Sequence, residues 1–238
     1  MESVKILIAN TTMGSGKSTL SLALAHYINN QPAEDSLTPI LVDCSDTRFI
    51  CNKRNNELNS FQGKIPPFEI LSLPVDKQVL FTNSINLIFN RDAIYLFDLP
   101  SETSQTDFIK FIPYTDFLLI PFIMTYSGIC DTARFLLFIK KSILLFNKKK
   151  IKGPEIILIP NMIPREGMDP AMCEYWAKKK ELFSTVSAIT PEIKWRDNLM
   201  MDLSTIIWHK EFQNLFSGAF NLIYNNIDSL YKERHSFN

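Results

Sequence analysis

The sequence has no excess of charge of either sign. It contains 25 Lys and Arg residues and 25 Asp and Glu residues, which gives a formal net charge of +0. A balanced charge gives no global reason to expect nucleic acid as a partner, so any such contact must come from a local basic patch.

Paired cysteines and long apolar runs are also absent from the sequence. Its cysteines form no C-x-x-C pair and have no histidine cluster near them to complete a zinc site; they are Cys44, Cys51, Cys130 and Cys173. The most apolar stretch, residues 135–146, is interrupted by two lysines and is shorter than the roughly 20 residues of a membrane span. The first residues lack the basic segment of a signal peptide. We therefore expect reduced thiols, no spanning helix and a cytoplasmic location.

The order of apolar patterns predicts a doubly wound α/β fold. Hydrophobic residues make up 46% of the 238-residue chain, enough for one domain over residues 1–238. Short apolar runs without a polar face predict buried strands at 4–9, 39–42, 93–97, 117–120, 156–159 and, more weakly, 185–189. Helical spacing is found at 20–28, 76–89, 105–112, 128–146, 169–183 and about 203–231. Residues 51–73 are expected to be a long excursion with at most a short helix. Alternating buried strands and helices are typical of a mostly parallel sheet covered on both faces.

A glycine-rich segment connects the first predicted strand to the first helix. It reads Gly14, Ser15, Gly16, Lys17, Ser18 and Thr19. Small residues let backbone N–H groups turn towards phosphate oxygens, while a lysine reaches the β- and γ-phosphates and a hydroxyl can bind Mg²⁺. The usual phosphate-loop pattern has a further glycine where this chain has Thr11. The segment predicts a phosphate-binding loop with one glycine replaced.

Two carboxylates follow predicted strands. Asp43 and Asp98 each come directly after an apolar run, at the sheet edge where ligands of open α/β sheets bind. Each could hold Mg²⁺ or its waters, or could instead cap a helix or form a turn.

These motifs together resemble the ParA/MinD family of P-loop ATPases over most of the chain. The likeness rests on the loop at 14–19, the Asp43 and Asp98 segments, Thr115–Pro121, Ile159–Asn161 and Ile189–Pro191, in the family's order. The resemblance implies ATP and Mg²⁺ as ligands and a homodimer that forms with ATP and is dismantled by hydrolysis. It assigns Lys17 and Asp43 to catalysis, Ser18, Asp43 and Asp98 to the metal, and Asn161 and Pro191 to the adenine base.

The chain departs from this family at two catalytic positions. The family's signature lysine corresponds to Thr12, and the second aspartate of its D-x-D switch corresponds to Ser45. Asp46, one residue further on, is the candidate substitute, although a shift of one residue re-aims the side chain. Losing a cation that stabilises the transferred phosphoryl group weakens catalysis more than ground-state binding. We therefore expect ATP binding with slow or partner-dependent hydrolysis.

Possible macromolecular partners are suggested by local patches. Lysines gather at 140–141, at 148–152 and at 178–180, and Lys194-Trp195-Arg196 places an aromatic between two cations. These are either solvated helix surfaces or contacts to DNA bound without sequence specificity. The last helix is apolar at three- and four-residue spacing, which favours packing on the sheet over membrane attachment.

The sequence is compatible with three hypotheses about function. The first is a ParA-like ATPase that acts as a dimer switch in DNA partition, positioning or transfer, together with a ParB-like or other partner. The second is a degenerate member that binds ATP with little hydrolysis and serves as an interaction subunit. The third, a small-molecule kinase or ligase on the same scaffold, would need an acceptor-activating base that the sequence does not reveal.

Overall fold

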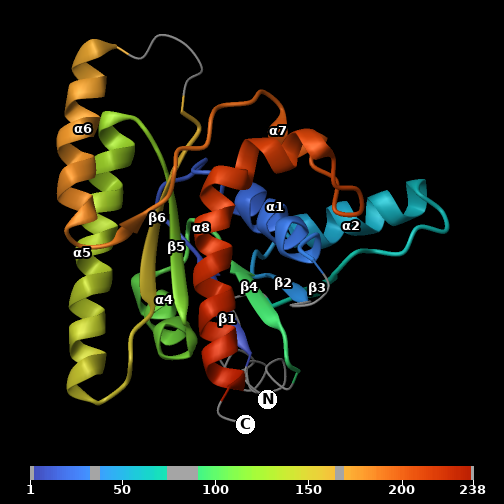
Figure 1. Ribbon diagram of the computed structural model, residues 1–238, viewed down its shortest axis with the longest axis horizontal. Coiled ribbons are helices and arrows are strands. Elements are labelled where there is room, and N and C mark those ends of the chain that lie inside the picture. Colours follow the sequence, from blue (N-terminus) through green and yellow to red (C-terminus); the bar gives the residue numbers. More distant parts are fainter. Residues whose placement is uncertain (1–2, 33–37, 74–90, 164–168, 237–238) are drawn as a thin grey trace.

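A parallel sheet forms the centre of the molecule (Figure 1). The computed structural model describes residues 3–32, 38–73, 91–163 and 169–236. The sheet that they form has seven strands in the order β3-β2-β4-β1-β5-β6-β7, and every pairing is parallel. The strands are β1 (Val4–Ile8), β2 (Pro39–Asp43), β3 (Glu69–Ser72), β4 (Ile94–Asp98), β5 (Phe117–Ile123), β6 (Glu155–Asn161) and β7 (Ala188–Ile189). The predicted doubly wound fold is confirmed.

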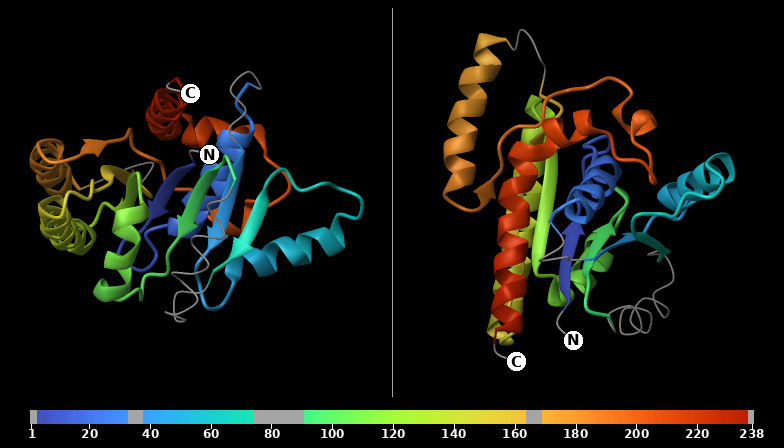
Figure 2. Two further views of the ribbon diagram at one scale, coloured as in Figure 1. Left: turned by 90° about the horizontal axis from the view of Figure 1, so that it is seen from below. Right: turned by 45° about the vertical axis from the view of Figure 1, so that its right-hand side comes forward.

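Helices cover both faces of this sheet (Figure 2). Helices α1 (Lys17–Asn29) and α8 (Lys210–His235) pack on one face, and α4 (Gln105–Phe111), α5 (Tyr126–Lys148) and α6 (Pro170–Ser184) pack on the other. Helix α2 (Phe49–Ser60) lies at the β2–β3 side of the molecule, and the short α7 (Leu199–Asp202) precedes α8. No helix among the described residues is long and apolar enough to cross a bilayer.

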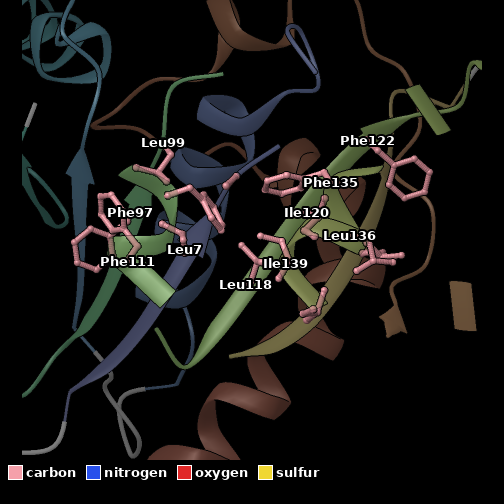
Figure 3. Packing of buried hydrophobic residues seen from close by; sticks show 14 of the residues in the cluster. Leu7, Phe97, Leu99, Phe111, Leu118, Ile120, Phe122, Phe135, Leu136 and Ile139 are labelled. Carbon is pink, nitrogen blue, oxygen red and sulfur yellow. The ribbon is translucent and has the colours of Figure 1, made fainter. Parts of the chain in front are cut away.

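Two hydrophobic cores share the central strands. Leu7 of β1 points into the core beneath α4, α5 and α6, which we call the α5-side core, while Ile6 and Ile8 point into the core beneath α1 and α8, the α8-side core. Strands β4 and β5 alternate in the same way. Figure 3 shows Phe97 and Phe111 on one side of the α5-side core and Phe122 and Phe135 on the other. Alternation along a strand thus gives each face its own apolar layer, which explains why the strands have no polar face.

The structure corrects three boundaries predicted from the sequence. Residues 51–73 contain most of the three-turn helix α2 and the edge strand β3 rather than an irregular excursion. The last helix begins at Lys210, because residues 203–207 form a separate segment that bonds to α2. The weak strand at 185–189 is reduced to Ala188–Ile189. The helix predicted at 76–89 lies outside the described residues.

Candidate nucleotide-binding site

The glycine-rich segment forms a loop between β1 and α1, as predicted. Gly14 and Gly16 have φ values of 70° and 85°, in the left-handed region that favours glycine. A Cβ on Gly16 would lie 2.3 Å from Nδ2 of Asn161, so this glycine also allows a close approach to the end of β6. Asn161 fixes that approach by donating from Nδ2 to the Ser15 carbonyl at 3.0 Å.

Asn10, which the sequence analysis did not single out, holds the start of the loop. Its Oδ1 accepts from the Thr12 amide at 3.2 Å, and its Nδ2 donates to the Pro121 carbonyl at 2.8 Å. The side-chain oxygens of Thr12 and Ser15 are buried, and within the described residues they have no hydrogen-bond partner. Buried hydroxyls without partners cost free energy, so this loop is suited to receive a polar ligand.

Lys17 is the first residue of α1, and only 7% of its surface is exposed. Its Nζ donates to Ser101 Oγ at 2.5 Å and to the Thr12 carbonyl at 3.4 Å, and in the part of the chain that is described it forms no ion pair with a carboxylate. Burial lowers the pKa of Lys17, because the attraction of Asp98 and Glu102 does not fully compensate for lost hydration. A buried ammonium without a paired anion at a helix N-terminus is an anion-binding arrangement.

Asp98 ends β4 directly beneath the loop. Its Oδ1 accepts from Ser21 Oγ at 2.9 Å, and the nearby Ser18 side chain helps to lower the pKa of this carboxyl. Burial raises the pKa of Asp98 to about 6, and the Asp43 charge adds to the rise, whereas Ser18, Ser21 and Lys17 oppose it. A buried carboxyl beside a serine at the mouth of the loop is the predicted pairing for Mg²⁺.

Asp43 is buried at the end of β2, and its oxygens are already occupied. Oδ1 accepts from the amide and the hydroxyl of Ser45, at 3.1 and 2.6 Å. Oδ2 accepts from the amides of Ile50 and Cys51, at 2.9 and 3.1 Å, and so caps the N-terminus of α2. In this conformation Asp43 therefore acts as the helix cap that the sequence left as an alternative.

Two predicted site residues are not brought to the phosphate loop. Asp46 is exposed and lines, with Glu102 and Asp107, a cavity next to the one of about 340 Å³ at the loop; Ser45 lines both cavities, but Asp46 does not line the loop cavity. Pro191 packs near Gly218 of α8 and lines neither this cavity nor the adjacent one described below.

A second cavity of about 210 Å³ adjoins the loop on the β6 side. Asn161 and Thr19 line it, together with Met162, Trp195 and Met200, which the sequence analysis did not assign to the site. Thr19 Oγ1 lies 3.3 Å from the sulfur of Met200, 181 positions away along the chain. An apolar wall of this kind suits a flat ring.

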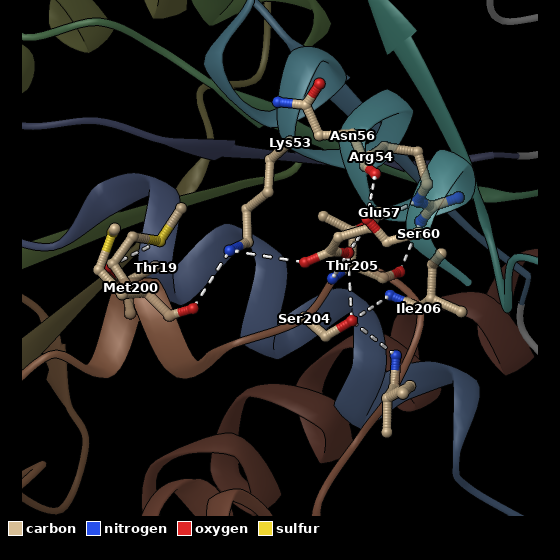
Figure 4. A network of polar contacts seen from close by, with 12 residues as sticks. Thr19, Lys53, Arg54, Asn56, Glu57, Ser60, Met200, Ser204, Thr205 and Ile206 are labelled. Carbon is tan, nitrogen blue, oxygen red and sulfur yellow. Dashed lines mark hydrogen bonds and ion pairs between the residues drawn. The ribbon is translucent and has the colours of Figure 1, made fainter.

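The wall formed by Met200 is tied to α2 through a polar network (Figure 4). Lys53 reaches the carbonyl of Met201 at 3.3 Å, and Glu57 accepts from the Thr205 amide at 2.7 Å. The buried Arg54 donates to the Thr205 carbonyl at 2.8 Å. Helix α2, capped at one end by Asp43, thereby supports the opposite wall of the site.

The residues present fit a nucleotide with one divalent cation. The described residues contain no cluster of three or more His, Cys, Asp or Glu side chains that could hold a metal alone. Mg²⁺ in phosphate-loop proteins takes most of its ligands from phosphates and water, so Ser18 and Asp98 are a sufficient protein contribution.

No family model matches this sequence, and no curated protein matches it. Solved structures do, and they share a three-layer P-loop α/β fold. McdA from Cyanothece superposes with a TM-score of 0.67 at 16% identity, over 93% of this chain and 100% of that one. A putative plasmid partition protein of Borrelia burgdorferi B31, bound to AMPPNP, gives 0.67 at 14% identity, over 94% and 100%. MinD of Aquifex aeolicus gives 0.58 at 16% identity, over 93% and 97%.

This chain therefore has the P-loop fold of the ParA/MinD ATPases. The resemblance inferred from the sequence motifs is confirmed at the level of the fold, over nearly the whole chain.

Proposed function

We propose that this protein binds ATP with Mg²⁺ at the loop of residues 14–19 and uses the nucleotide as a conformational switch. One observation carries the proposal: the Lys17 ammonium is buried at the start of α1, and among the described residues its acceptors are a hydroxyl and a carbonyl. A triphosphate would supply the missing negative charge, and backbone amides of the loop would bind its oxygens.

Structures of similar fold support ATP as the nucleotide. The Borrelia burgdorferi partition protein is bound to AMPPNP, and a McdA variant from Cyanothece, which superposes with a TM-score of 0.63, is a complex with ATP. In this chain Ser18 and Asp98 would hold Mg²⁺, and the base would lie between Asn161 and the apolar wall that contains Met200.

The geometry favours slow hydrolysis over rapid turnover. A general base must reach the attacking water, but Asp43 caps α2, Ser45 bonds to Asp43, and Asp46 lines the neighbouring cavity rather than the one at the loop. Hydrolysis through Asp43 would therefore require α2 to release its cap. We propose an ATP-bound homodimer in the cytoplasm that helps to position, partition or transfer DNA with a ParB-like partner, the interaction subunit with little turnover being the second candidate.

The first experiment compares ATP binding by the wild type, Lys17→Met and Lys5→Met, using isothermal titration with and without Mg²⁺. Lys17→Met keeps the apolar stem and removes the charge, so we expect ATP affinity to fall by about 10- to 100-fold. Lys5→Met changes a partly buried lysine at the other end of β1 and is expected to bind ATP as the wild type does.

Size-exclusion chromatography and phosphate release then separate the two candidates. A dimer that forms only with ATP–Mg²⁺ and turns over when a partner is present supports the switch, whereas the same dimer without turnover supports the interaction subunit. Equal ATP affinity in the wild type and Lys17→Met, with both proteins folded, would contradict nucleotide binding at this loop.

A further inference from the structure

Helix α5 has two unlike faces. One face packs on the sheet through Ile129, Phe135, Leu136 and Ile139, all of which are buried. On the opposite face, Leu137, Leu144 and Leu145 are each 62% exposed. Three exposed leucines on one helix leave apolar surface that the described fold does not cover.

Cations lie among these leucines. At 3.6 residues per turn, six exposed residues of the segment 134–148 fall within a sector of about 100° that is centred opposite the buried face. We call them the α5 outer stripe: Arg134, Leu137, Lys141, Leu144, Leu145 and Lys148. The stripe is about 21 Å long, from the rise of 1.5 Å per residue.

The charge of this region has one sign. Residues 132–154 contain seven Lys and Arg residues and no Asp or Glu. Arg134 pairs with Asp131 at 3.1 Å, and Lys140 donates to the Val186 carbonyl beside the stripe. Lys141 and Lys148 form no ion pair with any carboxylate of the described residues.

We propose that the α5 outer stripe binds the surface of an anionic lipid bilayer. Lysines attract anionic headgroups while their stems lie along the interface, and the leucines enter the boundary between headgroups and acyl chains. Duplex DNA could pair with the cations through its phosphates, but its backbone has no apolar surface for the three leucines to contact. The leucines therefore favour a lipid surface over DNA. This proposal does not depend on nucleotide binding.

The test is co-sedimentation of the full chain with phosphatidylcholine vesicles that contain or lack phosphatidylserine. Two variants remove one component each: Leu137→Ser/Leu144→Ser/Leu145→Ser removes the apolar contact, and Lys141→Ser/Lys148→Ser removes the charge. We expect either change to lower partitioning onto anionic vesicles by about tenfold or more. The matched control, Leu182→Ser/Lys180→Ser, changes exposed residues of the neighbouring helix α6 and should bind as the wild type does.

All of these substitutions are at exposed positions, so each variant is expected to fold, and circular dichroism checks this. Binding that needs phosphatidylserine, weakens with salt and is lost in both stripe variants supports the proposal. Wild-type protein that does not sediment with anionic vesicles overturns it. Retention on duplex DNA that depends on Lys141 and Lys148 but not on the leucines, without vesicle binding, would assign the stripe to nucleic acid instead.

Discussion

Burial and neighbouring polar groups act in opposite directions on the pKa of the Asp98 carboxyl. Full burial beneath the loop raises its pKa to about 6, although Ser18, Ser21 and Lys17 all stabilise the ionised form. At neutral pH this carboxyl is mostly ionised, and its ionised form lowers the stability of the folded protein relative to the unfolded chain. A buried group that destabilises the nucleotide-free protein is typical of residues retained for binding rather than for folding.

Asp98→Asn is expected to stabilise the nucleotide-free protein at neutral pH. Because the folded-state pKa of Asp98 is above its ordinary value of 3.8, its contribution to stability is fully present below about pH 4 and is lost as pH rises through about 6. Asparagine removes that loss, so the free energy of unfolding at pH 7.5 should rise by about 1–3 kcal/mol. Urea denaturation at pH 7.5 and at pH 5 measures this increase in the free energy of unfolding, which should be smaller at pH 5.

The same variant should lose the Mg²⁺-dependent part of ATP binding, measured by titration with Mg²⁺ and with a chelator. Asp107→Asn is the control, because hydrogen bonds from Lys110 and Ser104 lower the pKa of Asp107 and its loss should destabilise slightly. An Asp98→Asn protein that is less stable than the wild type at pH 7.5 would show that ionised Asp98 supports the fold.

At this scale the sequence predicted the loop well and its surroundings poorly. Gly14, Gly16 and Lys17 are recognisable because their spacing is local. Met162 and Met200 are not recognisable from the sequence, because they form a cavity wall only when the end of β6 and helix α7 come together beside α1. The capping role of Asp43 was one of two alternatives, since it depends on where α2 begins.

Among the elements, α1, α2 and residues 203–207 form one unit. His26 of α1 donates from Nε2 to the Ser204 carbonyl at 2.7 Å, and its ring stacks on Trp208 with centroids 5.2 Å apart. Helix α2 bonds to the next residue, Thr205, through Arg54 and Glu57. The chain between α7 and α8 is thereby fixed to the helix that follows the phosphate loop.

Helix α2 shows why this unit was missed from the sequence. It contains four Asn among its 12 residues and buries only Ile50 and Arg54, so it has almost no apolar periodicity to reveal it. Contacts with Asp43, at the end of the preceding strand, and with Thr205, which is distant in sequence, hold it in place. Strand β3 was missed for a related reason, since its residues are half-buried or exposed at the sheet edge.

The pH dependence of the stability of His26→Gln tests whether His26 is buried in this unit. Burial lowers the pKa of His26 to about 4 from its ordinary value of 6.5, so the unfolded chain takes up this proton first and stability falls as pH drops from about 6.5 to about 4. By pH 5 the wild type should have lost about 2 kcal/mol through this group. Glutamine does not titrate, so the stability advantage of the wild type at pH 7.5 should shrink by that amount at pH 5.

Urea midpoints at several pH values measure the difference, with His209→Gln as the control at an exposed histidine. An advantage of the wild type that stays constant between pH 7.5 and 5 would mean that His26 is not buried against Trp208 and Ser204 in solution.

The whole molecule has two cores but one sheet. Side chains of β1, β4 and β5 alternate between the α5-side core and the α8-side core, so neither apolar layer can open without disturbing the same strands. Trp176 belongs to the α5-side core and Trp208 packs against the α8-side core, which places one fluorescent reporter on each face.

Phe216→Ala tests whether these two layers unfold together. Phe216 is fully buried in the α8-side core and stacks on Phe220 with centroids 4.9 Å apart, so truncation should cost about 3–5 kcal/mol. In proteins that keep only Trp176 or only Trp208, the others being replaced by Phe, this variant should lower both urea midpoints equally. Phe135→Ala in the α5-side core is the matched change and should again move both reporters. A Phe216→Ala protein whose Trp176 midpoint stays at the wild-type value would mean that the faces unfold separately, and the shared strands would then not couple the nucleotide-site helix α1 to α5.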